Sequence, residues 1–302
     1  MLNNEVKKNV FLGIDGGGSK CKAVVISSEN EILGTGISGP GNPLHGFEQA
    51  KNSIVTSAKL ALANANIPES ELSNIIVGIG LAGVNLPILF EKMSTWQHPF
   101  KEMHLATDLL IACLGAHQGG DGAVIISGTG SCGFSHVGGE EYIVGAHGFP
   151  HGDKGSGAWF GLQAAKKVLL SLDGLVSQSS LNDKLLGFLN VKTDVELVEA
   201  IAGQSAAFYA RMANLVFDAA EQGDILALKI VKEGASYIDN VANKLSERNP
   251  PRVSLIGGLT PRLVPWLAEN VQKSLSAPLY PPEVGAYFYA KKQLLKDSSK
   301  SD

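Results

Sequence analysis

Short apolar blocks separated by glycine, proline and polar residues dominate the first third of the chain. Blocks rich in valine and isoleucine predict strands, and apolar positions spaced three and four apart predict helices. These patterns predict strands at residues 10–15, 21–26, 31–38, 74–81 and 101–106, and helices at residues 46–67, from residue 87, and from residue 109. The order of three strands, a helix, a strand, a helix, a strand and a helix is typical of an α/β domain.

The glycine-rich stretch GGDG at residues 119–122 then breaks the pattern, and the order starts again with strands. Apolar blocks predict strands at residues 123–127, 134–137, 142–146 and 252–256, and helices at residues 158–172, 194–202, 205–222, 225–245 and about 283–295. We therefore predict an N-terminal domain at residues 1–118 and a C-terminal domain at residues 119–302. The last helix, residues 283–295, is free to pack back on the first domain.

The first turn, VFLGIDGGGSKCKAVVI at residues 10–26, places Asp15 before three glycines, Ser19 and Lys20. Adjacent glycines are typical both of a hairpin turn and of a loop whose backbone N–H groups hold a phosphate, and one turn can do both. Residues 13–20 also read G-x-x-x-x-G-S-K, but a P-loop has lysine before serine and leads into a helix. Here a strand-forming stretch follows, so the pattern excludes a P-loop fold and keeps the phosphate hypothesis.

A second glycine turn, residues 128–133, matches G-x-G-x-x-G after a strand. A dinucleotide fingerprint requires a helix next and an acidic residue about 20 positions later. A strand and the sequence GGEEY follow instead. We therefore favour a second phosphate-binding hairpin, in which Thr129 offers a hydroxyl.

Two aspartates stand where a strand or loop leads into a helix. Asp108 follows the strand at residues 101–106, a place where open α/β sheets present ligands, although Thr107 and Asp108 also resemble a helix N-cap. Asp153, in HGDKGSG, is either a cap of the next helix or a ligand for a polar substrate. If the two halves of the chain face each other, both glycine turns and Asp108 converge on one cleft.

Composition and charge narrow the function. With 302 residues, 44% hydrophobic and 18% charged, a formal net charge of −4 and only three cysteines, the chain has no basic surface typical of nucleic-acid or membrane binding and no disulfide framework. No apolar stretch is long enough for a membrane span. His147 and His151 lie on a glycine and proline loop, which does not match a zinc motif. A small-molecule enzyme of the cytoplasm is the expectation.

Five motifs then occur in order: DGGGSK at residues 15–20, TD at 107–108, SGTGS at 127–131, GDKGSG at 152–157 and IGGL at 256–259. Together they resemble the BadF/BadG-type ATPases and, within that group, the N-acetylglucosamine and glucosamine kinases of the actin-like sugar kinase superfamily. The resemblance covers nearly the whole chain. It implies two ribonuclease-H-like, actin-like ATPase domains flanking a nucleotide cleft.

The resemblance also implies roles for single residues. Asp15 would hold Mg²⁺, largely through water, and Asp108 would be the catalytic base that takes the proton of the sugar 6-hydroxyl. The ATP phosphates would contact Gly17, Gly18, Ser19, Lys20, Gly128, Thr129 and Gly130, and Gly257 and Gly258 would lie under the adenosine. Asn42, Ala82, Gly83, Asp108 and Asp153 would contact the sugar.

By this resemblance the chain is an ATP-dependent kinase that phosphorylates the 6-hydroxyl of N-acetylglucosamine, with glucosamine as the alternative substrate. The resemblance also allows a homodimer. From another class, the ATPase activators of acyl-CoA dehydratases share the phosphate loops, but they need cysteines for an iron-sulfur cluster. Cys21 and Cys132 adjoin the phosphate turns and Cys113 lies in an apolar helix, which disfavours the activator.

Overall fold

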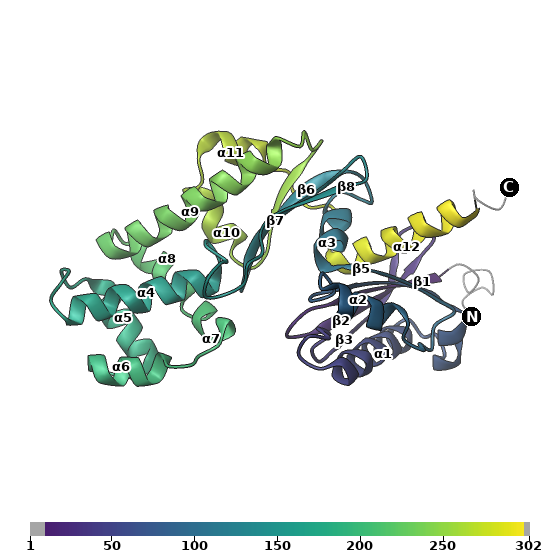
Figure 1. The fold of residues 1–302 in the computed structure, drawn as a ribbon, viewed down its shortest axis with the longest axis horizontal. Coiled ribbons are helices and arrows are strands. Elements are labelled where there is room, and N and C mark those ends of the chain that lie inside the picture. The colour runs from purple at the N-terminus through teal and green to yellow at the C-terminus, as the bar shows by residue number, and fades with distance from the viewer. Residues whose placement is uncertain (1–9, 299–302) are drawn as a thin grey trace. The chain divides into compact units, whose positions relative to one another are not determined.

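The computed structural model describes residues 10–298, and its chain divides into two compact units. Unit 1 contains the chain up to Gly122 and again from Pro278, and unit 2 contains Ala123 to Ala277. Both are α/β, as the alternation of elements predicts. The last helix, α12 (Pro282–Ser298), belongs to unit 1, and in Figure 1 it lies against the first strands of the chain.

Unit 1 is built on a five-stranded sheet in the order β3-β2-β1-β4-β5. Its strands are β1 (Val10–Gly16), β2 (Cys21–Ser27), β3 (Ile32–Ser38), β4 (Ile76–Leu81) and β5 (Glu102–Thr107). Strands β1, β2 and β3 pair antiparallel, while β1, β4 and β5 run parallel. The carboxyl ends of β1, β4 and β5 therefore meet at one edge of the sheet.

Helices cover both faces of this sheet (Figure 1). Helix α1 (Phe47–Asn64) packs its buried alanines and Ile54 on one face, against Leu12 and Ile14. On the other face lie α12 and α3 (Asp108–Ala116). The remaining segments of unit 1 are α2 (Pro87–Ser94) and a 3-10 turn, Glu69–Asn74.

Glycines allow α12 to lie directly on the strands. A Cβ on Gly13 would be 2.0 Å from the Glu283 carbonyl oxygen, and one on Gly78 would be 1.9 Å from that of Ala286. Both separations are far below any real contact, so only glycine fits there. The start of α12 is thereby fixed on the face of β1 that carries Gly13 and, two residues later, Asp15.

Unit 2 has a four-stranded sheet in the order β8-β7-β6-β9. Its strands are β6 (Gly122–Ser127), β7 (Ser131–Val137), β8 (Glu140–Gly145) and β9 (Val253–Ile256). Strands β6 and β9 are parallel, so the residues that follow them, from Gly128 and from Gly257, leave the sheet at the same edge.

Most of unit 2 is helical, and its core forms between the helices and residues of β6 and β9. The helices are α4 (Gly157–Leu172), α5 (Ser180–Leu189), α6 (Asp194–Ile201), α7 (Ala206–Ala210), α8 (Ala213–Glu221), α9 (Ile225–Ser246), α10 (Thr260–Leu263) and α11 (Glu269–Ser274), with a 3-10 turn at Val264–Trp266. Phe160 of α4 and Phe217 of α8 are fully buried with ring centroids 4.9 Å apart. Gly234 of α9 lies against Phe160, because a Cβ there would be 2.5 Å from the ring.

The structure corrects several predicted boundaries. Unit 2 starts at Ala123 rather than residue 119 and ends at Ala277, because the chain from Pro278 returns to unit 1. The predicted helix at residues 205–222 is two helices, α7 and α8, separated at Arg211 and Met212. Strand β7 starts at Ser131, inside the predicted glycine turn, and α5 and α11 were not predicted.

Candidate active site

The first glycine turn joins β1 to β2 and is a hairpin rather than a P-loop. Asp15 is paired with Lys22 and Gly16 with Cys21 across the two strands. The Gly17 N–H donates to the Lys20 carbonyl at 2.9 Å, which closes the turn. The structure thus confirms the strand after Lys20.

Two glycines of this turn have no neighbour that requires them. A Cβ on Gly18 would meet no atom within 4 Å, and one on Gly17 would meet only the Lys20 carbonyl oxygen at 3.6 Å. Gly16 differs, because a Cβ there would be 2.4 Å from Leu81. The protein's own packing explains Gly16 but leaves open space at Gly17 and Gly18, as a backbone that receives a ligand would have. Ser19 and Lys20 are exposed beside them.

Predicted sugar residues lie next to this turn, at the carboxyl edge of the unit 1 sheet. The Ala82 N–H donates to the Gly16 carbonyl at 3.0 Å, and the Gly41 N–H donates to the Gly17 carbonyl at 2.9 Å. Asn42 follows directly and lies against Gly83, where a Cβ would be 2.4 Å from its Oδ1. That oxygen also accepts the Leu44 N–H at 2.9 Å. Asn42, Ala82 and Gly83 therefore form one cluster with the first turn.

Asp108 stands at the same edge, since Thr107 at the end of β5 is in register with Leu81 at the end of β4. Thr107 is the N-cap of α3, because its hydroxyl accepts the Leu110 N–H at 3.2 Å. Asp108 is thus the first residue of the helix rather than its cap, and its Oδ1 accepts the Leu109 N–H at 3.0 Å. Burial raises the pKa of Asp108 despite hydrogen bonds from the backbone that lower it.

The Asp15 carboxyl is the most perturbed acid of this cluster. Burial, and after it the negative charges of Glu283 and Asp108, raise its pKa to about 7, while Lys20 and Lys22 lower it. A carboxyl whose pKa is raised to near 7 by burial and neighbouring acids favours the binding of a cation, which takes the place of the proton.

The sequence did not reveal Glu283 as a member of this cluster. It belongs to the first turn of α12, more than 260 positions after Asp15, and its side chain is 3% exposed. The Lys22 Nζ lies 2.5 Å from its Oε1. The cross-strand register of the β1–β2 hairpin places Lys22 on the face of Asp15, but no local pattern brings Glu283 to that face.

The second glycine turn, Gly128 to Gly130, belongs to unit 2 and connects β6 to β7. The Gly128 N–H donates to the Gly130 carbonyl at 3.0 Å. The start of α4 holds this turn, because the N–H groups of Gly157 and Ala158 donate to the carbonyls of Gly128 and Thr129. A Cβ on Gly128 would meet no atom within 4 Å, so this glycine, like Gly18, faces open space.

Two serine hydroxyls tie the loop before α4 to this turn. The Ser127 hydroxyl donates to the Gly155 carbonyl at 2.9 Å, and the Ser131 hydroxyl donates to the Lys154 carbonyl at 2.7 Å. The motifs SGTGS and GDKGSG, more than twenty positions apart, therefore form one structure.

Asp153 belongs to that structure and lies beside Gly130, where a Cβ would be 2.8 Å from Asp153 Oδ2. Burial raises the pKa of Asp153, while hydrogen bonds with the backbone of Ser131 and Gly148 and the charge of His147 lower it. Asp153 is not the N-cap of α4, since Ser156 accepts the Trp159 N–H at 3.1 Å. Its carboxyl braces the second turn.

Gly257 and Gly258 lie beside the second turn. Gly257 has a φ of 115°, and a Cβ there would be 2.2 Å from the Ser127 carbonyl oxygen, so packing requires this glycine. The Leu259 N–H donates to the same oxygen at 3.2 Å. A Cβ on Gly258 would meet nothing within 4 Å. Unit 2 therefore joins Gly128–Gly130, Asp153 and Gly257–Gly258, while unit 1 joins the first turn, Asn42, Ala82, Gly83 and Asp108.

Among residues 10–298 there is no group of three or more His, Cys, Asp or Glu side chains that could hold a metal ion. Mg²⁺ is usually bound by one or two carboxylates together with water and substrate phosphates. Asp15, partly exposed beside an open turn, offers such a hard oxygen donor. The donor set therefore fits Mg²⁺ brought by a nucleotide.

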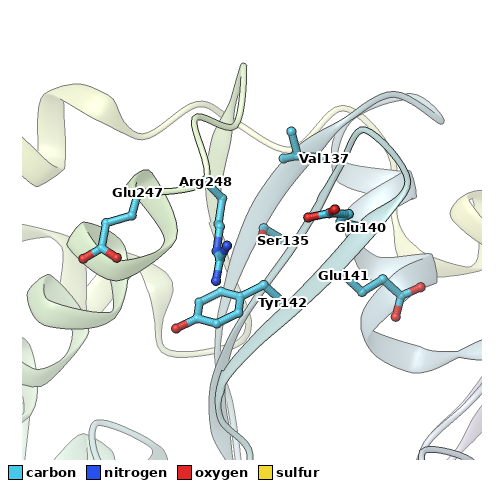
Figure 2. Close-up of a pocket in the computed structure, with 7 residues that line it drawn as sticks. All are labelled: Ser135, Val137, Glu140, Glu141, Tyr142, Glu247 and Arg248. Carbon is cyan, nitrogen blue, oxygen red and sulfur yellow. The ribbon is translucent and has the colours of Figure 1, made fainter.

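A pocket of about 380 Å³ lies elsewhere in unit 2, on β7, β8 and the end of α9. Figure 2 shows the Arg248 guanidinium directed at the Tyr142 ring, with a separation of 4.1 Å from its centroid. The residues that line the pocket are Ser135, Val137, Glu140, Glu141, Tyr142, Glu247 and Arg248. None of the predicted site residues lines this pocket.

Two sequence expectations concern what the chain lacks. Cys21, Cys113 and Cys132 are all buried and form no disulfide. Over the described residues, no helix combines the length and apolar character that crossing a membrane requires.

Comparison with known proteins yields a family match over residues 12–290, to the BadF/BadG/BcrA/BcrD ATPase family. The glucosamine kinase GspK of Vibrio cholerae is 33% identical over 287 residues, which cover 94% of this chain and 96% of that protein. An N-acetylmuramic acid/N-acetylglucosamine kinase of Clostridium acetobutylicum is 27% identical, covering 88% of this chain and 90% of the relative.

Solved structures show the same fold. A Chromobacterium violaceum protein with the provisional name N-acetylglucosamine kinase has a TM-score of 0.87 at 28% identity, covering 94% of this chain and 99% of that one. A ROK hexokinase of Thermus thermophilus, at 16% identity and a TM-score of 0.55 with 94% and 99% coverage, shares the fold.

Proposed function

The chain belongs to the BadF/BadG/BcrA/BcrD ATPase family, and from this premise we propose that it phosphorylates the 6-hydroxyl of N-acetylglucosamine. It is an ATP-dependent amino-sugar kinase with two ribonuclease-H-like, actin-like ATPase domains. The observation that carries this proposal is the cluster at the carboxyl edge of the unit 1 sheet. There Asp108, a half-buried acid whose pKa is raised by burial, lies at the same sheet edge as Asn42, Ala82, Gly83 and the open glycine turn.

In this proposal Asp108 is the general base. Its Oδ1 is engaged by the Leu109 N–H, so we assign Oδ2 to receive the proton of the 6-hydroxyl as the phosphoryl group is transferred. A raised pKa makes a carboxylate a better base at neutral pH. The Leu109 bond also fixes the carboxyl orientation, which favours one direction of approach by the hydroxyl.

The phosphates of ATP are assigned to the two glycine turns. In unit 1 the turn Gly17–Lys20 supplies the N–H groups of Gly18 and Ser19 and the ammonium of Lys20, while the Gly17 N–H closes the turn. In unit 2 the turn Gly128–Gly130 supplies N–H groups and the Thr129 hydroxyl, and Gly257 and Gly258 lie under the adenosine. The open space at Gly18, Gly128 and Gly258 supports this assignment, since no protein contact requires those glycines.

A bound Mg²⁺ would neutralise charge on the phosphates as transfer proceeds, which is the main requirement of this reaction. Asp15 is the residue assigned to it, largely through water. Asn42, Ala82, Gly83 and Asp153 are assigned to the sugar, where paired hydrogen bonds avoid buried unsatisfied hydroxyls. Asn42 can offer its amide nitrogen, because its Oδ1 accepts the Leu44 N–H.

Glucosamine is the second candidate substrate, favoured by the 33% identity to the glucosamine kinase of Vibrio cholerae. The two sugars differ at one nitrogen: an ammonium needs a facing acceptor or carboxylate, whereas an acetamide needs room for a methyl group. The acyl-CoA dehydratase activator loses support, because each of the three cysteines is buried inside its unit.

A coupled ADP-release assay over a panel of amino sugars tests the proposal. N-acetylglucosamine is expected to give the highest kcat/KM, and NMR of the product should place the phosphate on the 6-oxygen. Preference for glucosamine would move the proposal to the second candidate. Release of ADP that no sugar stimulates would refute a kinase of either kind.

A further inference from the structure

The unit 1 face that carries Asp15 also carries an ion pair to which the proposed mechanism gives no role. Lys22 is the cross-strand partner of Asp15 in the hairpin of β1 and β2, and directly opposite residues of antiparallel strands point to the same face. Opposite charges in such positions normally pair. The Lys22 Nζ instead lies 2.5 Å from Glu283 Oε1.

Burial makes this pair expensive to keep. The Glu283 side chain is 3% exposed and that of Lys22 is 31% exposed. Replacing a buried ion pair by apolar side chains is often neutral or stabilising, so stability alone does not account for it. Val24, Ile26, Val284 and Tyr287 form a buried cluster at the start of α12, where Glu283 lies.

The position of Glu283 is set by the backbone rather than by the ion pair. Its carbonyl oxygen lies against Gly13, which belongs to the same face of β1 as Asp15. The packing of α12 on β1 therefore delivers a carboxylate to the Lys22 ammonium. The ion pair therefore follows from the backbone packing of α12 rather than from the attraction between the two side chains.

Charge counting shows the consequence for Asp15. The charged groups that act on it are Glu283, Asp108, Lys20 and Lys22. With Asp15 itself ionised, three negative and two positive groups leave one net negative charge for a cation. Without Glu283 the sum is zero, and the flexible Lys22 side chain is free to turn to Asp15.

We propose that Glu283 is a positioning residue for the metal-binding carboxylate: by holding the Lys22 ammonium, it prevents that ammonium from pairing with Asp15. The inference rests on the proposed function in one respect, the assignment of Asp15 to the metal. Lys20, exposed at the tip of the turn, remains available for the nucleotide phosphates, whereas Lys22 is held.

Binding of Mn²⁺, a paramagnetic substitute for Mg²⁺, tests the inference without catalysis. Mn²⁺ is titrated into the protein with a non-hydrolysable ATP analogue and followed by electron paramagnetic resonance. Glu283→Gln keeps the side-chain shape and is expected to weaken Mn²⁺ binding about tenfold, because it releases Lys22 toward Asp15. Adding Lys22→Met to that variant is expected to restore the affinity to the wild-type range.

The recovery in the double variant separates this role from a structural one, since a merely structural pair would leave the double variant as weak as Glu283→Gln. Glu69→Gln is the matched control. It removes the carboxylate partner of Lys59, at 2.7 Å, elsewhere in unit 1, and should leave Mn²⁺ affinity unchanged. Steady-state kinetics should show the Glu283→Gln defect in the metal requirement, with the KM for sugar unaltered.

Three outcomes would overturn the inference: unchanged Mn²⁺ affinity in Glu283→Gln, failure of Lys22→Met to restore it, or a wild-type protein that binds no Mn²⁺ with the analogue. If Glu283→Gln does not fold, the single variant Lys22→Met tests the inference. It should bind Mn²⁺ at least as tightly as the wild type. A tenfold loss of affinity would overturn the inference. An amino-sugar panel without turnover, beside intact Mn²⁺ binding, would reject the proposed function and leave this inference standing.

Discussion

At the residue scale, the acids of unit 1 show a conflict between stability and function. Burial and two neighbouring acids raise the pKa of Asp15 to about 7. A carboxyl whose pKa is higher in the folded than in the unfolded state contributes stability while it is protonated. That contribution is lost as the pH rises from the unfolded pKa, near 4, through the folded pKa. The free protein is therefore destabilised by Asp15 at the pH at which the ionised carboxylate is useful.

Asp15→Asn should remove this penalty. In the absence of metal and nucleotide we expect the variant and the wild type to have similar free energies of unfolding near pH 4, and the variant to be more stable above about pH 7. Urea denaturation across this range measures the difference. A variant less stable than the wild type at high pH would contradict the stated environment of Asp15. Metal-dependent turnover should be lost in the same variant.

Asp108→Asn tests the base. Because asparagine keeps the shape but cannot accept the proton, kcat should fall by about 10² to 10⁴, with ATP affinity nearly unchanged. Stopped-flow measurement of product formation and calorimetry of ATP binding separate the two effects. Turnover at the wild-type level would remove Asp108 from the role of base.

In the wild type, kcat/KM should fall at low pH as Asp108 becomes protonated. This fall should occur at a pH above the ordinary pKa of an aspartate, because the pKa of Asp108 is raised.

At the element scale, the strands and most helices follow from apolar spacing, and the hairpin of β1 and β2 could be predicted because Cys21 to Ile26 disfavours a helix. The break between α7 and α8 could not. Residues 205–222 keep an apolar face of helical period throughout, and only the local backbone at Arg211 and Met212 interrupts it. Ser131 belongs to β7 rather than to the turn, and its hydroxyl donates to the Lys154 carbonyl in the loop before α4, a contact more than twenty positions away that the local pattern does not contain.

The docking of α12 on β4 is sensitive to a single added carbon atom. Gly78→Ala places a Cβ where the separation from the Ala286 carbonyl oxygen would be 1.9 Å, so the helix must move away from the sheet. We expect a loss of about 1–3 kcal/mol or more in the free energy of unfolding, as overpacking usually costs. Gly187→Ala, in α5 with open space around it, is the control and should be neutral or stabilising. Equal stability of the two variants in thermal denaturation would show that the helix does not pack as described.

At the scale of the whole molecule, local patterns found the order of elements but placed the domain boundaries only approximately. The glycine-rich stretch GGDG at residues 119–122 marked the point near Gly122 where the chain passes from unit 1 to unit 2. No local pattern indicates that the chain rejoins unit 1 at Pro278. That rejoining depends on glycines in β1 and β4, which allow α12, from the far end of the chain, to pack on these strands. For the same reason Glu283 could not be predicted as a neighbour of Asp15. Asp15, Asn42, Ala82, Gly83 and Asp108 come together because the strands before them end at one edge of the unit 1 sheet. The strand pattern of the sequence indicated this place for Asp108, whereas Asn42, Ala82 and Gly83 were expected at the site only through the family resemblance.

The central proposal assigns each of the two glycine turns to the phosphates of ATP, and the ATP affinity of two alanine variants tests it most directly. Neither Gly18 nor Gly128 has a neighbour within 4 Å of its Cβ position, so alanine should fold normally at either site. We predict that calorimetry gives about tenfold weaker ATP binding for Gly18→Ala and for Gly128→Ala, and wild-type binding for Gly187→Ala. Wild-type affinity in either turn variant, with the fold intact, would contradict the account.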